Sequence, residues 1–204
     1  MPDPGSFGTV FLKFVFLLTP FAGVSTFLAL APPEARERRR VALRATLAVV
    51  VFCLVFYFFG RFLFDMLAIT VDAFRIGAGA ILFLSGAAMA RGTSKSSLPP
   101  GTDDDQDIAV VPIALPVTVG PGTTGALLVM ASEPTTMAER AVTLAALLAA
   151  CGVVGVALLL ADPLQRVLGA RGITILTKLT GLFLAALAAE IVFTGVRNFL
   201  TAGA

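Results

Sequence analysis

Long apolar segments constrain the fold of this chain more than any other feature. Six of them each approach the roughly 20 residues that an α-helix needs to cross about 30 Å of hydrocarbon. These segments are about Val10–Ala31, Val41–Phe64, Ala73–Ala90, Ile108–Ala131, Ala141–Ala161 and Ile175–Leu200. With 57% hydrophobic residues among 204 and a mean hydropathy of +0.94, the chain has more apolar surface than a soluble domain can bury. The sequence therefore predicts an all-α membrane protein with six transmembrane helices.

Charge and residue usage argue against several classes of protein. Charged residues make up 14% of the chain and the net charge is only +2, so we expect no nucleic-acid partner. Histidine is absent, which removes the usual zinc ligands and the Ser-His and Cys-His catalytic pairs. The two cysteines, Cys53 and Cys151, lie deep in apolar segments and are interpreted as packing residues. We expect no catalytic residue, no metal site and no cofactor.

The distribution of basic residues predicts the orientation of the chain. Cytoplasmic loops of membrane proteins carry an excess of Lys and Arg. Here basic residues gather after the first, third and fifth segments: Arg36, Arg38, Arg39, Arg40, Arg91, Lys95, Arg166 and Arg171. We therefore expect these loops in the cytoplasm of a bacterial cell and both termini on the periplasmic or extracellular side of its inner membrane. The first segment has full length and follows no basic region, so we expect it to stay attached.

A polar stretch divides the chain into two similar halves. Residues 1–92 and 108–204 each contain three predicted spans, and the linker 93–107 is rich in Ser, Pro, Gly and Asp. At an offset of about 100 residues, Pro20 of the first half falls on Pro121 of the second. Because each unit has an odd number of spans, two copies lie upside down relative to each other, as in the inverted repeats of secondary transporters. The alternative is two unrelated helices that each contain proline.

Proline and glycine interrupt the first and fourth segments near their middles. Pro removes a backbone donor and Gly lowers helix propensity, so Thr19-Pro20 and Gly120-Pro121-Gly122 predict breaks in the two helices. Unpaired backbone groups are tolerated in a membrane only where they face protein or a wet cavity. Half-helix ends and nearby hydroxyls then form a candidate substrate site, made of Thr19, Pro20, Ser25, Thr26, Pro116, Gly120, Pro121, Gly122, Thr123 and Thr124. The alternative is a structural kink without a ligand.

Three charged residues lie in or at the edges of the apolar segments. Glu190 lies well inside the sixth segment, where a carboxylate is costly and usually marks a pathway or a buried pair. We consider it a candidate proton carrier or cavity residue, with a hydrogen bond in the bundle interior as the alternative. Arg75 and Lys178 occupy equivalent positions in the two halves, near the start of the third and sixth segments. They are candidate coupling charges, or they anchor the helices at the membrane interface.

Three stretches resemble the motifs of one known family. PIALPVTVGPGTTGALLVM resembles the MarC family signature, roughly P-L-A-I-P-x-x-x-G-P-G-A-I-[ST], and ITVDAFRIGAGAILFLSG and LTKLTGLFLAALAAEIVFTGVRNF resemble two more of its segments. The resemblance covers nearly the whole chain. It carries over onto Pro116, Gly120, Pro121, Gly122, Arg75 and Gly181. Two departures concern polar positions: Thr19 stands where the family usually has Asn, and Glu190 where Gln is common.

The resemblance implies a six-span inner-membrane protein related to neutral amino acid transporters and LysE-type exporters. No Walker-type G-x-x-x-x-G-K sequence is present, so transport would be coupled to H⁺, to Na⁺ or to the substrate gradient. We therefore expect a secondary transporter or exporter of small zwitterionic metabolites such as alanine or glycine. Its partners would be membrane lipid and the small-molecule substrate, and a homo-oligomer is one possible assembly. The alternatives are a channel for ions or small solutes and an intramembrane enzyme.

Overall fold

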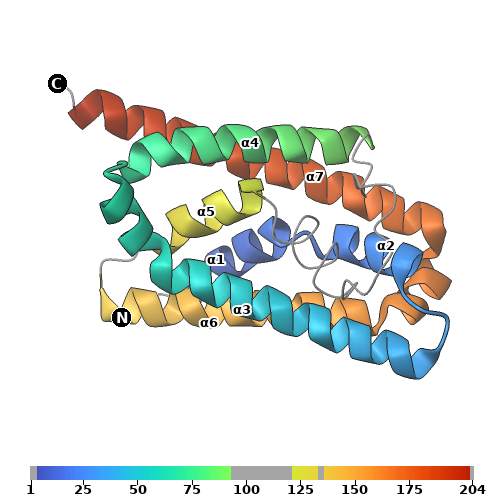
Figure 1. Ribbon diagram of the computed structural model, residues 1–204. Coiled ribbons are helices and arrows are strands. Elements are labelled where there is room, and N and C mark those ends of the chain that lie inside the picture. The colour runs from blue at the N-terminus through green and yellow to red at the C-terminus, as the bar shows by residue number, and fades with distance from the viewer. Residues whose placement is uncertain (1–3, 93–120, 133–135, 203–204) are drawn as a thin grey trace.

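The computed structural model describes residues 4–92, 121–132 and 136–202, and these residues form helices without any strand. The helices are α1 (Pro4–Leu17), α2 (Pro20–Leu30), α3 (Ala35–Leu67), α4 (Val71–Arg91), α5 (Pro121–Ser132), α6 (Met137–Leu159) and α7 (Ala161–Ala202). They lie alongside one another in a bundle with both termini at the same end (Figure 1). The predicted all-α architecture is confirmed.

Five stretches of the described residues are long and apolar enough to cross a membrane. They are Phe7–Leu30, Ala35–Gly60, Val71–Arg91, Met137–Leu159 and Ala161–Thr201. The fourth predicted span is described only from Pro121 onward, as α5. At about 1.5 Å per residue, the 12 residues of α5 extend about 18 Å, which is too short to cross the membrane.

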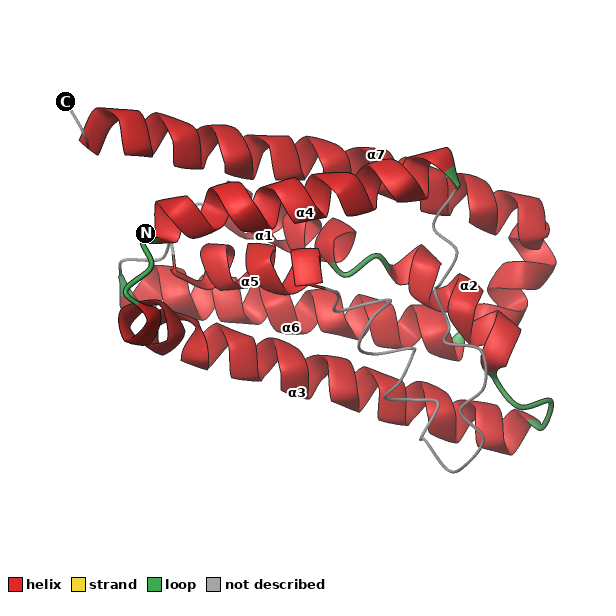
Figure 2. Ribbon diagram, turned by 45° about the horizontal axis from the view of Figure 1, so that its top comes forward, coloured by secondary structure: helices red, strands yellow, loops and turns green. Residues whose placement is uncertain are grey.

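The predicted break in the first apolar segment is present. Helix α1 ends at Leu17, α2 begins at Pro20, and Thr19 between them has a left-handed backbone conformation with φ of 44°. Figure 2 shows this connection near the middle of the bundle, with the first turn of α5 beside it. A non-glycine residue at positive φ costs roughly 1–2 kcal/mol, so the surrounding packing holds the break in place.

Positive φ angles also occur at Ala68 and Gly169, where the chain changes direction, and at Gly92, which ends α4. Ala68, with φ of 51°, lies between α3 and α4, and Gly169, with φ of 66°, lies at a kink inside α7. The kink separates a short helical piece from the long final helix. The stretch from Ala161 to Ile173 is helical on both sides of Gly169. Its Leu, Gln and Arg residues favour helix, and only the kink redirects the chain.

Contacts between the two halves of the chain organise the bundle. Helix α2 packs against α6 and α7, whereas α5 packs against α3 and α4. Helices α4 and α7 form the most extensive contact of all. There a Cβ placed at Gly86 would lie 2.6 Å from the Ala185 nitrogen, and one placed at Gly181 would lie 2.7 Å from the Ala90 nitrogen. Two glycines therefore allow the two backbones to touch, as small residues do in membrane helix pairs.

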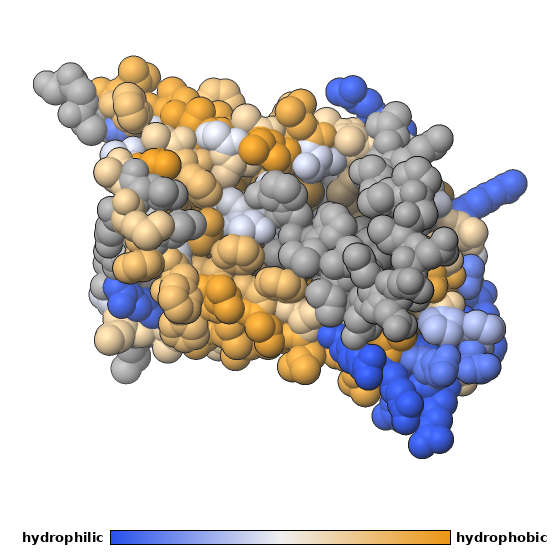
Figure 3. Space-filling model, in the orientation of Figure 1, coloured by the Kyte–Doolittle hydropathy of each residue, from blue (hydrophilic) through white to orange (hydrophobic). Residues whose placement is uncertain are grey.

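Charged residues gather at one end of the bundle. Figure 3 shows hydrophilic residues where α3 begins and hydrophobic residues over most of the remaining described face. The arginines 36, 38, 39 and 40 had been predicted in a loop, but they lie in the first turns of α3. Contacts of Arg38 with two other helices account for part of this difference. Its Nη2 lies 2.8 Å from Asp162 Oδ1 of α7, and its guanidinium lies 5.6 Å from the centre of the Phe27 ring of α2.

Candidate functional site

The break between α1 and α2 lies beside the start of α5, where the described part of the fourth predicted segment begins. The hydroxyl of Thr123, in the first turn of α5, donates a hydrogen bond to the carbonyl oxygen of Leu17, the last residue of α1, over 3.4 Å. These residues are 106 positions apart in the chain. Thr123 is 7% exposed and Leu17 is fully buried. The contact therefore joins the end of α1 to the first turn of α5 inside the bundle.

The break between α1 and α2 rearranges the backbone hydrogen bonds of four residues. Pro20 has no N–H to donate, and the N–H of Thr19 donates to Phe16 O over 3.2 Å, which closes the last turn of α1 tightly. The Thr19 carbonyl accepts from the N–H groups of Ala22 and Gly23 and so begins α2. Because the α-helical ladder stops here, the Leu17 carbonyl is available to the Thr123 hydroxyl.

Close packing on α4 explains the glycines at the start of α5. A Cβ at Gly122 would lie 2.8 Å from Leu82 Cα and 2.9 Å from Leu82 N, so only glycine lets α5 approach the α4 backbone this closely. One turn later, a Cβ at Gly125 would collide with the Ala78 Cβ. Residues from Gly122 to Met130 are buried, apart from the half-buried Thr124. The short α5 is thus enclosed by other helices.

Helix dipoles converge on this contact. Helix α2 begins at the break after α1, the described part of the fourth segment begins with α5, and the two helices run toward opposite ends of the bundle (Figure 1). Helix N-termini present unpaired N–H groups and a partial positive charge, which suits a carboxylate. Helix α1 ends at the same place, and its last carbonyls carry the opposite partial charge. The start of α2 therefore offers donors for an anion beside the end of α1, which offers acceptors for a cation.

The structure buries some of the predicted hydroxyl groups and exposes others. Thr19 and Thr26 are 3% and 8% exposed and belong, with Thr123, to the buried polar residues of the bundle. Thr124 is half-buried, but Ser25 is exposed on α2 and does not join the buried hydroxyl groups. Two further predicted residues, Pro116 and Gly120, lie outside the described residues.

Glu190 has a partner that sequence reasoning missed. Lys13 Nζ of α1 lies 2.8 Å from Glu190 Oε1 of α7, and the two side chains are 33% and 58% exposed. The carboxylate thus lies on the surface of the bundle rather than in its interior. Nearby, the rings of Phe16 and Phe183 stack with their centres 4.6 Å apart and hold α1 against α7. The signal available in the sequence was Lys13, a basic residue inside the first apolar segment that needs a partner of opposite charge.

Arg75 and Lys178 lie away from the breaks, at opposite ends of the α4–α7 pair. Asp72 Oδ1 accepts hydrogen bonds from Arg75 Nη1 over 2.6 Å and from Asn198 Nδ2 over 3.1 Å. This network ties the start of α4 to the end of α7. At the other end, the Lys178 ammonium would lie 3.2 Å from a Cβ at Gly92, the residue that ends α4. Arg75 therefore lies beside the start of α4, and Lys178 of α7 lies beside its end.

Comparison with known proteins identifies the family to which this sequence is similar. The model of the MarC family of integral membrane proteins matches residues 5–200. A UPF0056 membrane protein of Methanocaldococcus jannaschii is 30% identical over 189 residues, which cover 90% of this chain and 92% of that protein. The UPF0056 inner membrane protein YhgN of Escherichia coli is 30% identical over 192 residues, covering 91% and 93%. No solved structure matches the chain.

Proposed function

Because the chain belongs to the MarC family of integral membrane proteins, we propose that it is a secondary transporter of small zwitterionic metabolites such as alanine or glycine, and not an enzyme. The observation that carries the proposal is the buried contact between Thr123 and Leu17, which joins a helix N-terminus to a helix C-terminus across the two halves. Broken helices at mid-depth are where many secondary transporters bind substrate.

The packing of the helices supports an inverted repeat. If the first half is exchanged for the second, α2 takes the place of α5, α3 that of α6, and α4 that of α7. Under this exchange the contacts of α2 with α6 and α7 become the contacts of α5 with α3 and α4, and both sets occur. The positive-φ residues Ala68 and Gly169 are also separated by the same 101 positions as Pro20 and Pro121. Alternating access by rocking one repeat against the other fits this arrangement.

The chemistry at the breaks suits a zwitterion. The carboxylate of the substrate would accept hydrogen bonds from the first turns of α2 and α5. The ammonium of the substrate would donate hydrogen bonds to carbonyls at the end of α1. The buried hydroxyls of Thr19 and Thr123 would complete the polar contacts. Thr19 replaces the usual Asn of the family and has a shorter reach, so we expect it to influence which substrate is accepted.

The arginine-rich end of the bundle supports an orientation with both termini outside. Positive residues favour the cytoplasmic side, and the two termini lie at the opposite end (Figure 1). The related E. coli protein is named an inner membrane protein, and we propose the inner membrane for this chain too. Coupling to H⁺ or Na⁺ completes the proposal, with Glu190 as the candidate proton carrier.

A binding experiment with one variant and one matched control tests the site. The purified protein is melted with and without alanine and glycine, with and without Na⁺, at two pH values. We expect a neutral amino acid to raise the melting temperature. Thr123→Val removes the hydroxyl at the breaks and should weaken binding about fivefold, since one hydrogen bond contributes roughly 1 kcal/mol. Thr143→Val is the control, because its hydroxyl donates to Glu139 O of its own helix.

Transport is then measured as exchange of labelled amino acid in proteoliposomes. The proposal predicts saturable exchange that is weakened by Thr123→Val and retained by Thr143→Val. If no neutral amino acid shifts the melting temperature and none exchanges under any ion condition, the proposed substrate class is wrong. If both variants weaken binding equally, the site lies elsewhere.

A further inference from the structure

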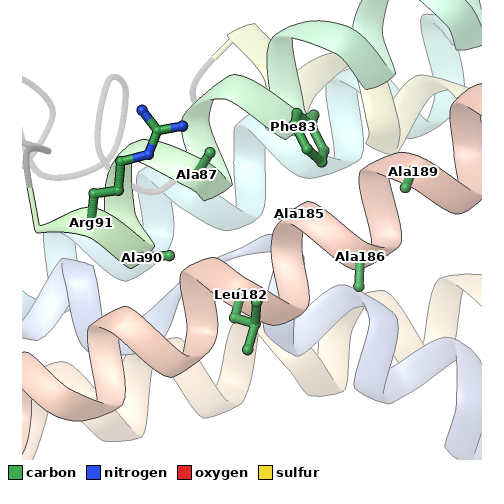
Figure 4. Close-up of a pocket in the computed structure, with 8 residues that line it drawn as sticks. All are labelled: Phe83, Ala87, Ala90, Arg91, Leu182, Ala185, Ala186 and Ala189. Atoms are coloured by element: carbon green, nitrogen blue, oxygen red, sulfur yellow. The ribbon is translucent and has the colours of Figure 1, made fainter.

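An apolar groove runs along the outside of the α4–α7 pair. Its volume is about 390 Å³, within the range of about 300–1,000 Å³ typical of small-ligand sites. Five of its eight lining residues are alanines, which come from both helices. Figure 4 shows the row on α4 from Phe83 at one end to Arg91 at the other, facing the row on α7 from Leu182 to Ala189.

Close packing at the glycines creates this groove. The backbones of α4 and α7 touch at Gly86 and Gly181, and the alanines beside this contact are too short to fill the space outside it. Phe83 and Leu182 border the space and are 46% and 60% exposed. In a membrane such a surface faces acyl chains.

The length of the groove matches one leaflet of a bilayer. Phe83 and Arg91 are eight residues apart along α4, or about 12 Å at 1.5 Å per residue. Half of the roughly 30 Å hydrocarbon core is about 15 Å. The groove, which begins at the end of α4, is therefore nearly as long as one leaflet of the hydrocarbon core is thick.

Two cations lie at the mouth of the groove. Arg91 is exposed in the last turn of α4 and has no hydrogen-bond or ion-pair partner among the described residues. The Lys178 side chain lies against Gly92, the next residue, with its ammonium 3.2 Å from the position of a Cβ there. Two positive charges thus flank the apolar groove at the end of the bundle where the other arginines gather. Basic pockets between helices at this depth suit anionic lipid headgroups.

The geometry points to a binding site for one anionic phospholipid of the cytoplasmic leaflet. An acyl chain fills the alanine-lined groove, and the headgroup phosphate lies between Arg91 and Lys178. Zwitterionic lipids enter the same groove with less affinity, because they bring no net charge to the two cations. The lipid holds the outer face of the α4–α7 pair and leaves the helix breaks on the other side of α4 untouched.

Native mass spectrometry of the purified protein in mild detergent tests the site. The protein is titrated with phosphatidylglycerol and with phosphatidylcholine of the same acyl chains. Each cation near the surface contributes about fivefold in affinity. The Arg91→Gln, Lys178→Gln double variant should therefore bind phosphatidylglycerol about 30-fold more weakly. The control carries Arg166→Gln and Arg171→Gln, two exposed cations of α7 that do not line the groove.

A second pair of variants tests the acyl chain. Ala186→Leu fills the groove and should weaken both lipids, whereas Ala149→Leu adds the same bulk to an exposed position on α6 and should weaken neither. Melting curves establish that each variant is folded. Equal effects of the two charge variants, equal binding of the two lipids by the native chain, or a dimer that occupies the groove without lipid would each overturn the proposal.

Discussion

Replacing Gly86 by alanine tests the helix contact on which the bundle depends. A Cβ at this position would lie 2.6 Å from the Ala185 nitrogen and 2.8 Å from the Gly181 carbonyl oxygen. Both atoms belong to the backbone of α7, so no side-chain rotation can relieve the collision. Helices α4 and α7 would have to move apart along their shared face.

Gly77 provides a matched control on the same helix. A Cβ there would meet no atom within 4 Å. Both substitutions gain the same helix propensity, which is about 1 kcal/mol in water. The difference between them therefore isolates the packing cost, which is about 1–3 kcal/mol for an extra methyl group in a filled core. For a chain of 150–250 residues, 1 kcal/mol changes the melting temperature by about 2–4 °C. We expect Gly86→Ala to melt about 2–12 °C below Gly77→Ala.

The chain contains its own probes for this measurement. It has no Trp and one Tyr, so intrinsic fluorescence is weak. Cys53 and Cys151 are 1% and 0% exposed, and a thiol-reactive fluorogenic dye reports their exposure during unfolding. Equal melting temperatures of the two variants would refute the close approach of α4 and α7 at Gly86. A lower melting temperature for Gly77→Ala would refute the argument from open space.

Two further predictions use the same assay. Ala68→Gly should raise the melting temperature and Gly169→Ala should lower it, each by about 2–4 °C, because both positions have positive φ and a side chain there costs roughly 1 kcal/mol. Changes of the same sign would contradict the assigned backbone conformations. Lys13→Met and Glu190→Gln should each destabilise the protein more than the double variant does, because a single change leaves one charge unpaired. Strictly additive effects would mean that the two side chains do not interact.

The sequence predicted the features that depend on local patterns. A long apolar run must be helical in a membrane because its backbone groups have no other partners, and the described spans follow these runs. Pro20 predicted the first break because a proline removes a donor wherever it stands. The position of the break was thus predictable to the residue, whereas the left-handed backbone of Thr19 was not.

Features that depend on how helices are rotated against each other were not predictable. Ser25 and Thr26 are adjacent, yet one is exposed and the other is buried. Which of them faces inward is decided by the change of direction at the break. Lys13 and Glu190 are 177 positions apart, and only the packing of α1 on α7 brings them together. Arg38 at the start of α3 was predicted in a loop because its partner Asp162 is also distant in the sequence.

Helix α4 connects the candidate substrate site with the outer surface of the bundle. One face of it presents Ala78 and Leu82 to the glycines at the start of α5, and another presents Gly86 to α7. Both contacts are made at backbone distance, so neither can slide without a movement of α4 itself. If the proposed transport moves α5, the movement either carries α4 along or opens the α4–α5 contact while α4 stays on α7. Helix α4 contacts α7 more extensively than it contacts α5. Opening of the α4–α5 contact is favoured, because α5 is shorter than α7 and fewer glycine contacts join it to α4.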